Sequence, residues 1–339
     1  MAAKRLCFAS RVSGIAGPAS FQRRLADGLA RRHVECSYDL QDSECDAVLV
    51  IGATRHLAGL RRSRRRGIPI VQRLDGRNWI HRRRWTGLGH YLRAEWNNRM
   101  LRLVRDRLAS TVVYQSEFAR GWWERDCGPA PVRAVVVHNG VDLERYAPGG
   151  AGEPPADRRR VLVVEARFEG GYDVGIGWAL GLAERLARDG NQPVELVFAG
   201  AVRAKSRRPQ AAPGVSAVWL GVMPPDEIPK LDRSAHFLFS SDLHPACPNS
   251  VIEALACGLP VVAFDTGALP ELVQGDSGRL VPYGGDPWRI EPPDLDGLAA
   301  AAKHVLGDQP RFRAAARKQA ETSLSLEDMV QGYIDVLGW

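Results

Sequence analysis

The stretch that decides the fold is CPNSVIEALACGLPVV, residues 247–262. Its pattern predicts a turn, a short helix and then a buried strand. Gly258 and Pro260 mark the end of the helix, because glycine suits the left-handed C-terminal position and proline cannot continue a helix. Ser250 and Glu253 have the S-x-x-E spacing of a capping box, in which both side chains bond backbone N–H groups at the helix start. A helix followed directly by an apolar strand is typical of α/β proteins.

Similar short apolar runs recur along the chain, with helical stretches between them. They are RLCFA (5–9), DAVLVIG (46–52), IPIVQRL (68–74), STVVYQ (110–115), RAVVVHNG (133–140), RVLVVEA (160–166), VELVFAG (194–200), SAVWLG (216–221), AHFLFSS (235–241), PVVAF (260–264) and GRLVP (278–282). Their residues are continuously apolar rather than alternating, which indicates strands buried on both faces, as in a parallel sheet. Between the first two runs, Phe21, Leu25 and Leu29 form one stripe of an amphipathic helix.

A break in this pattern divides the chain into two halves. The segment APGGAGEPPADRRR (147–160) is rich in Gly and Pro, as expected for an interdomain linker. We therefore predict an N-terminal domain at 1–147, a linker at 148–160 and a C-terminal domain at 161–324. The helical stretch 325–339 is predicted to pack back on the first domain. Strands alternating with helices in each half predict an α/β fold of two doubly wound, Rossmann-like parallel-sheet domains facing each other across a cleft.

Composition limits the class of protein. The 339 residues are 45% hydrophobic, which is enough for two cores, and no apolar run approaches the length of a membrane span. The apolar run near the N-terminus is too short for a signal peptide. The six cysteines form no CxxC pair and show no zinc spacing, so we expect reduced thiols in a cytoplasmic protein.

The net charge of +7 hides an asymmetry. Residues 1–150 carry 27 Lys and Arg against 14 Asp and Glu, whereas residues 151–339 carry 19 against 25. The basic half contains the arginine-rich runs RRSRRRG (61–67) and HRRRW (81–85). Such a half is either a solvated surface or a face for peripheral contact with the anionic inner leaflet of a membrane. Nucleic acid is not expected as a partner, because no recognised nucleic-acid motif accompanies the charge.

Glu253 has two interpretations on spacing alone. It is either the second member of the capping box or a ligand-binding carboxylate. A helix N-terminus carries unpaired N–H groups and the positive end of the helix dipole, so it is a natural site for phosphate. A carboxylate one turn further on accepts hydrogen bonds from ribose hydroxyls. The helix also follows the AHFLFSS strand at its carboxyl end, where open α/β sheets bind their ligands.

The segment PNSVIEALACGLPVVAFDTGALPELV (248–273) resembles the donor-binding segment of the retaining glycosyltransferases of family 4, which have the two-domain GT-B fold. Further segments resemble that family in the same order along the chain. They are QRLDGRNW (72–79), YQSEFAR (114–120), VHNGVD (137–142) and LGVMPPDEIPKLDRSAHFLFSS (220–241). The resemblance covers most of the chain and implies a nucleotide-diphosphate sugar as the substrate held by the second domain, with no separate cofactor.

The resemblance also implies roles for individual residues. Glu253 would bind the ribose hydroxyls, and Arg167 would neutralise the diphosphate, for which its planar fork of donors is well suited. Fixed positive charge at the diphosphate lowers the barrier to departure of the sugar. Backbone groups would contact the sugar or phosphate at Asn249, Ser250 and Val251, and would approach the donor or acceptor at Gly14 and Gly17.

Two positions depart from the family pattern. The family has a first Glu eight residues before the second, where this chain has Pro245, and neither Asp242 nor His244 is in register with it. The family also has a Lys-Gly after the arginine, whereas this chain has EGGYD (169–173). Lys205, together with the neighbouring Arg203, either supplies the missing cation or belongs to a solvated loop.

Asp75 is the candidate on the acceptor side. It follows the IPIVQRL strand, and either orients or deprotonates the attacking hydroxyl or serves as a turn residue in DGRN. Asp294 and Asp296 imitate a DxD metal motif, but they precede an apolar helical run, so helix capping explains them better. No other cluster has metal-ligand spacing, and the sequence therefore predicts a metal-independent enzyme.

These observations predict a retaining glycosyltransferase that moves a hexosyl-type sugar to an acceptor hydroxyl in polysaccharide or glycolipid biosynthesis. The acceptor would be a lipid-linked or soluble glycan, or a natural-product aglycone. Two alternatives remain open, namely a nucleotide-sugar epimerase on the same fold and a non-catalytic binding or scaffold protein. A dinucleotide oxidoreductase is disfavoured, because no GxGxxG motif opens either half.

Overall fold

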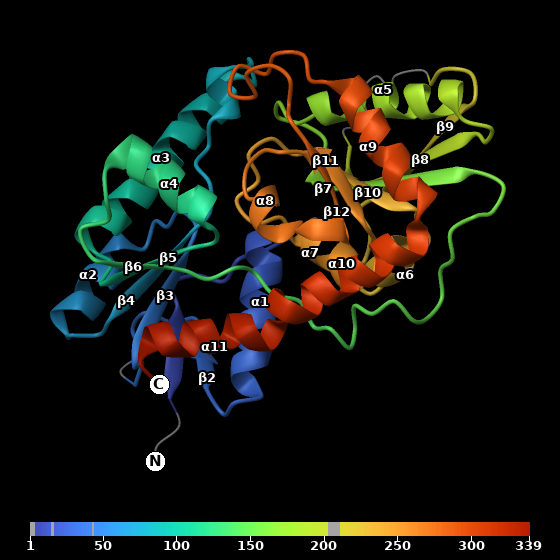
Figure 1. Cartoon of the computed structure of the whole chain (residues 1–339). Helices are drawn as coiled ribbons and strands as arrows, with labels where there is room; N and C mark the ends of the chain where they lie inside the picture. Colours follow the sequence, from blue (N-terminus) through green and yellow to red (C-terminus); the bar gives the residue numbers. More distant parts are fainter. Residues whose placement is uncertain (1–3, 15–16, 43, 203–210) are drawn as a thin grey trace. The chain divides into compact units, whose positions relative to one another are not determined.

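The computed structural model describes residues 4–14, 17–42, 44–202 and 211–339 (Figure 1). The chain forms two compact units. Unit 1 is Met1–Arg82, Thr86–Gly140 and Leu326–Trp339, and unit 2 is Arg83–Trp85 and Val141–Ser325. The chain passes from unit 1 to unit 2 at Gly140 and Val141, before the predicted linker at 148–160. The reason is that Val141 bridges to Ser325 and Tyr146 is buried in the core of unit 2.

Unit 1 is built around one parallel sheet. Its elements are β1 (Arg5–Phe8), α1 (Gly17–Ala30), β2 (Glu35–Ser37), β3 (Ala47–Ile51), α2 (Leu57–Arg65), β4 (Ile70–Leu74), the 3-10 turn η1 (Ile80–Arg82), α3 (Leu88–Arg107), β5 (Thr111–Tyr114), α4 (Glu117–Cys127), β6 (Arg133–Val136) and α11 (Leu326–Leu337). The central strands β3, β4 and β5 are buried at every residue, as the continuous apolar runs predicted.

The strand order of unit 1 is β2-β1-β3-β4-β5-β6, and each pair is parallel. From β1 the chain moves outward to β2 and then returns to the other side of β1 to form β3. The order therefore reverses between β1 and β3. In open α/β sheets such a switch point leaves a crevice outside the carboxyl ends of the strands, where ligands bind.

Helix α11 packs within unit 1 although it is more than 180 residues from β6 along the chain (Figure 1). It lies beside α1, with the Tyr333 ring 5.3 Å from that of Phe21. A Cβ added at Gly28 would come within 2.4 Å of Val330, so the two helices approach at that glycine. The predicted stripe of Phe21, Leu25 and Leu29 is buried in the same core.

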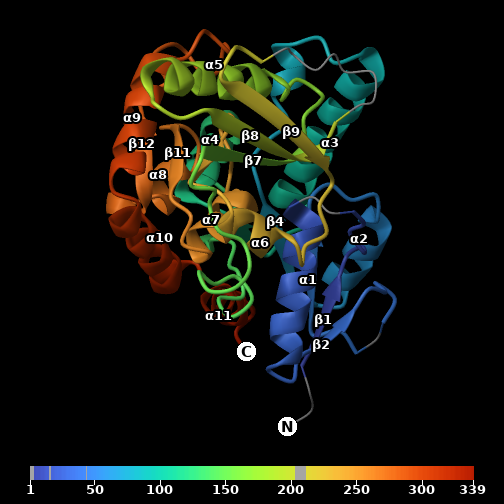
Figure 2. The same cartoon turned by 90° about the vertical axis from the view of Figure 1, so that its right-hand side faces the viewer.

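Unit 2 contains a second parallel sheet of six strands. Its elements are β7 (Arg159–Arg167), α5 (Val174–Asp189), β8 (Val194–Ala201), β9 (Val215–Gly221), α6 (Ile228–Arg233), β10 (Phe237–Ser240), α7 (Asn249–Ala256), β11 (Val261–Phe264), α8 (Leu269–Leu272), the 3-10 turn η2 (Gly275–Ser277), β12 (Gly278–Val281), α9 (Leu295–Gly307) and α10 (Gln309–Ser323). Figure 2 shows α5 lying over the β8 and β9 side of this sheet.

The strand order of unit 2 is β12-β11-β10-β7-β8-β9, again parallel throughout. The chain builds outward from β7 to β9 and then crosses back to β10, so this sheet has its switch point between β7 and β10. Each unit thus has the doubly wound arrangement that the sequence predicted. Within the described residues, no helix combines the length and the apolar character needed to cross a bilayer.

Candidate functional site

The N-terminus of α7 lies at the switch point of unit 2, following β10. Pro248 occupies the N-cap position and makes no side-chain cap. The capping box, one of the two interpretations that the spacing of Ser250 and Glu253 allowed, is therefore wrong, because the helix begins at Asn249 and Ser250 is already inside its first turn. The first-turn amides of a helix have no acceptor within the helix, so this end of α7 presents N–H donors and positive potential.

Glu253 lies in the second turn of α7 and is 9% exposed. It faces Asp232 of α6, which is 1% exposed. Burial, and then the charge of Glu253, raise the pKa of Asp232 well above its usual value, while the Cys257 thiol opposes the shift. Burial therefore favours the protonated form of Asp232. The sequence analysis did not identify Asp232, because a single carboxylate in a short helix does not by itself indicate a site.

A second pair of acidic side chains lies between β7 and β10. The Ser241 hydroxyl donates a hydrogen bond of 3.0 Å to Glu165 Oε1. Burial and the nearby Asp242 charge raise the pKa of Glu165, and burial raises the pKa of Asp242. A Cβ added at Gly175 would come within 2.7 Å of the Ser241 Cβ, so the start of α5 packs directly against this loop. Glu165 was missed because the run around it was interpreted only as a buried strand.

The loop between β10 and α7 is fixed by its backbone and by stacking. His244 has a φ of +58°, a value that non-glycine residues seldom adopt and that is concentrated at functional sites. Its ring stacks on Trp288 with centroids 3.6 Å apart. The carbonyl of Pro245 accepts a hydrogen bond from Ala268 N at 2.8 Å. The residue that replaces the family's first Glu therefore anchors the loop to the turn after β11.

Arg167 ends β7 at the same edge of the sheet. Its side chain is 64% exposed and pairs with Glu169 at 3.4 Å. The turn that follows contains Gly170 and Gly171, both with positive φ. The other proposed cation, Lys205, lies outside the described residues, as does Arg203. The structure thus brings Arg167, Glu253 and the start of α7 to one edge of unit 2.

The remaining sequence-predicted residues belong to unit 1. Asp75 follows β4 and is half-buried; burial raises its pKa, and the Arg73 guanidinium opposes the rise. Its carbonyl accepts a hydrogen bond from Trp123 Nε1 at 2.7 Å. Gly14 has a φ of +100° with no atom near the position of a Cβ, and Gly17 is the first residue of α1. Asp75, Gly14 and Gly17 all follow carboxyl ends of strands in the unit 1 sheet.

The aspartates that imitate a metal motif have structural partners. Asp294 is the N-cap of α9 and accepts a hydrogen bond from Gly297 N at 2.8 Å, so the capping interpretation is confirmed. Asp296 pairs with Arg185 at 2.6 Å. Among the described residues, no group of three or more His, Cys, Asp or Glu side chains is arranged to hold a metal ion.

Comparison with known proteins agrees with this geometry. Residues 159–308 match the family model described as glycosyl transferases group 1, and residues 19–145 match that of glycosyltransferase family 4. The chain is 30% identical over 193 residues to the D-inositol 3-phosphate glycosyltransferase of Actinosynnema mirum, covering 52% of this chain and 45% of that protein. It is 28% identical over 273 residues to the GDP-mannose-dependent alpha-mannosyltransferase of Mycobacterium tuberculosis, covering 77% and 64%.

The chain thus spans between about half and two thirds of the length of these two relatives. Among solved structures, it resembles HepE of Anabaena in complex with UDP-glucose. The TM-score is 0.68, the sequence identity is 18%, and the match covers 98% of this chain and 99% of that one. At this identity the likeness establishes the fold, which is GT-B, as the resemblance of residues 248–273 implied.

Proposed function

Because the chain belongs to the group 1 glycosyltransferases of family 4, we propose that it transfers a hexosyl-type sugar from a nucleotide-diphosphate sugar to an acceptor hydroxyl. One observation carries the proposal. The start of α7, the Glu253 carboxylate and the exposed Arg167 lie at one edge of the parallel sheet of unit 2, at its switch point. That set supplies an acceptor for ribose hydroxyls and donors for a diphosphate.

The proposed chemistry follows from these groups. As the sugar leaves, negative charge grows on the diphosphate, and Arg167 with the first-turn amides of α7 stabilises it. Fixed cations of this kind do the work of a metal ion, so we propose a metal-independent reaction. The Glu253 carboxylate accepts hydrogen bonds from the ribose hydroxyls. We propose retention by same-face attack assisted by the departing phosphate, because the family that the chain resembles is a retaining one.

We assign the sugar contact to the acidic pair at β7 and β10. Pro245 has no side chain that hydrogen-bonds a sugar hydroxyl, whereas Glu165 and Asp242 lie at the switch point with raised pKa values. A carboxyl group accepts hydrogen bonds and, when protonated, also donates one, as recognition of a hydroxyl requires. Asp75, a stronger base than an ordinary Asp, is proposed to receive the proton of the attacking hydroxyl.

The proposed acceptor is a glycan, a lipid-linked glycan or a small natural-product alcohol. Relatives named for inositol phosphate and for GDP-mannose support a polyol acceptor and a nucleotide-sugar donor of this class. The test is incubation with UDP-, GDP-, ADP- and dTDP-sugars, with and without acceptors, followed by assay of free nucleoside diphosphate.

Diphosphate release that requires an acceptor supports transfer. Epimerised sugar without release would point to an epimerase, and tight binding without turnover would point to a binding protein. Proton NMR of the anomeric centre of the product distinguishes retention from inversion. Unchanged rates after treatment with EDTA are expected, and loss of activity that Mg²⁺ restores would contradict metal independence.

We further propose peripheral contact of unit 1 with an anionic membrane, in the cytoplasm at the inner membrane face. Four large apolar side chains are exposed on the N-terminal half of α3, namely Leu88, Tyr91, Leu92 and Trp96. Their spacing places them on one face of the helix. Leu88 and Leu92 are 62% and 59% exposed.

The basic charge of the same region fits an anionic bilayer. Arg93 and Arg99 are exposed on α3 and make no ion pair with a described residue. Aromatic and leucine side chains enter the interface while arginine contacts lipid headgroups. The occupant we propose is therefore a lipid surface rather than a protein.

Vesicle cosedimentation tests this contact. The double variant Leu88→Ser with Leu92→Ser should reduce binding to vesicles that contain phosphatidylglycerol. The matched control is Leu220→Ser with Val222→Ser, two exposed positions at the end of β9 in unit 2, and it should not reduce binding. Equal binding by both double variants would contradict the assignment of the α3 face.

A further inference from the structure

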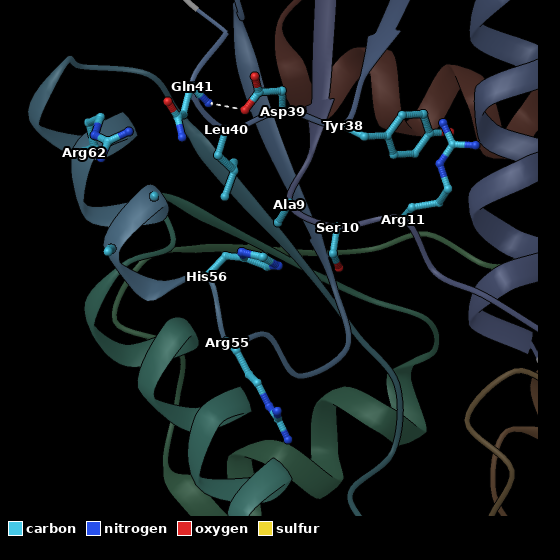
Figure 3. Close-up of a pocket in the computed structure, with 12 residues that line it drawn as sticks. Ala9, Ser10, Arg11, Tyr38, Asp39, Leu40, Gln41, Arg55, His56 and Arg62 are labelled. Carbon is cyan, nitrogen blue, oxygen red and sulfur yellow. Dashed lines mark hydrogen bonds between the residues drawn. The ribbon is translucent and has the colours of Figure 1, made fainter.

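A pocket of about 660 Å³ opens at the switch point of unit 1. Its walls come from the residues after β1, after β2 and after β3, and from the first turns of α2 (Figure 3). Because β1 and β3 are parallel neighbours whose helices leave in opposite directions, their carboxyl ends form the crevice in which sheets of this kind bind ligands. The pocket lies wholly within unit 1, and the donor-binding groups of unit 2 take no part in it.

The lining of this pocket is strongly basic. It includes Arg11, Arg55, Arg62 and His56, against one carboxylate, Asp39. Within the described part of the chain, none of the three guanidinium groups forms an ion pair. Asp39 Oδ1 accepts a hydrogen bond from the backbone of its neighbour Gln41 at 2.8 Å. Three arginines that find no acidic partner around a single cavity indicate an anionic ligand.

Two of these arginines are held by aromatic rings. The Arg11 guanidinium carbon lies 4.3 Å from the centre of the Tyr38 ring, and that of Arg55 lies 5.5 Å from the Trp96 ring. Stacking occupies the flat face of a guanidinium and leaves its N–H edges available for hydrogen bonds. Figure 3 shows the His56 ring turned into the pocket, with Arg62 at one rim and Arg11 at another.

The N-terminus of α2 adds to the positive electrostatic potential of the pocket. His56 is its N-cap and makes no side-chain cap, while Ala58 and Gly59 of the first turn line the pocket. A Cβ at Gly59 would come within 2.8 Å of Leu40, so this glycine lets the helix start approach the opposite wall. The helix dipole therefore reinforces the arginines rather than acting alone.

We propose that this pocket binds a phosphate group, and that the phosphate belongs to the acceptor substrate. The anion site stands on the geometry of unit 1, whereas its assignment to an acceptor rests on the proposed function. Asp75 lies at the same edge of the sheet, after β4, which neighbours β3. A phosphorylated sugar or polyol, held by its phosphate between β1 and β3, presents a hydroxyl toward the candidate base.

Isothermal titration without donor tests the anion site independently of catalysis. The ligands are inorganic phosphate, glucose 6-phosphate, glucose, and vesicles containing phosphatidic acid. The variant Arg11→Gln with Arg62→Gln removes two lining guanidinium groups that make no ion pair with a described residue. The matched control Arg61→Gln with Arg65→Gln removes the same charge from exposed positions outside the lining.

The wild type should bind glucose 6-phosphate and not glucose. The lining double variant should lose about tenfold or more in affinity, and the control should keep it. If the same loss appears only with phosphatidic acid vesicles, the phosphate is that of a lipid and the site stands. Absence of phosphate binding in the wild type, or an equal loss in the control, would overturn the proposal. Failure of transfer with intact phosphate binding would instead count against the proposed function alone.

Discussion

Replacement of Gly267 by alanine should destabilise unit 2 and weaken donor binding together. Gly267 lies in the turn after β11, where the structure holds the loop that carries Pro245. Its φ is +63°, and a left-handed conformation costs an L-residue about 1–2 kcal/mol. A Cβ there would lie 2.4 Å from Pro245 Cδ and 2.6 Å from its carbonyl oxygen, so the loop must move.

The magnitude follows from these two effects. Overpacking of this kind costs about 1–3 kcal/mol, so the total loss is about 2–5 kcal/mol. Gly221→Ala is the matched control, because Gly221 has a φ of +70° and no atom within 4 Å of the added Cβ. The loss of stability in Gly221→Ala should therefore be only the cost of the left-handed conformation, about 1–2 kcal/mol. The difference of about 1–3 kcal/mol corresponds to a melting temperature lower by about 2–12 °C in a unit of this size.

The assay pairs thermal unfolding with titration of UDP and GDP. Gly267→Ala should melt below Gly221→Ala and bind the nucleotide more weakly, because the displaced loop leads directly into α7. Equal melting temperatures for the two variants would refute the close approach of Pro245. A lower melting temperature with unchanged nucleotide affinity would show that the loop does not position the donor site.

Further outcomes follow from the charged groups. Arg167→Ala should lower kcat/KM by about tenfold or more through lost diphosphate contacts, with melting temperature unchanged, while Arg188→Ala, equally exposed and also paired, should leave both unchanged. Burial raises the pKa of Asp75, so the folded state holds that proton more tightly, and stability falls as pH rises from the ordinary Asp range to the raised pKa of the folded state. Asp75→Asn should therefore raise the melting temperature at pH 7 but not at pH 3, and should abolish the acid limb of the pH–rate profile.

The strands were predictable because each is a local property of the sequence. The run at 46–52 became β3 at Ala47–Ile51, and every residue of it is buried, as its continuous apolar sequence indicates. The order of the strands was not predictable in the same way. It depends on pairings such as Val161 with Phe237, which no local pattern encodes.

The start of α7 shows where local reasoning failed. Ser250 and Glu253 have the spacing of a capping box, yet the helix begins at Asn249, because Pro248 in an extended conformation takes the N-cap position. Spacing describes which residues face each other on a helix but not where the helix starts. The charge of Glu253 acts on Asp232, which comes from a different helix and which no local spacing identifies.

The same limit applies to the arginines of unit 1. The run RRSRRRG at 61–67 gave no means of separating one arginine from another. In the structure Arg62 lines the pocket whereas Arg61 and Arg65 do not, because a helix turns successive side chains about 100° apart and only one face of α2 meets the crevice. A run of arginines therefore predicts a positive electrostatic potential, and the fold decides which of these arginines contribute to a site.

The described residues at the two switch points differ in their charged groups. Among the described residues, the switch-point edge of unit 2 combines the exposed Arg167 with Glu253 and with the carboxyl pair of Glu165 and Asp242. That of unit 1 is lined by arginines with a single carboxylate. A donor brings sugar and ribose hydroxyls, which carboxyl groups bind, together with one diphosphate, which a cation and a helix end bind. An arginine-lined crevice suits a ligand whose charge is concentrated in a phosphate. The difference between the two crevices therefore favours an acceptor that carries a phosphate where it binds unit 1 over a neutral glycan.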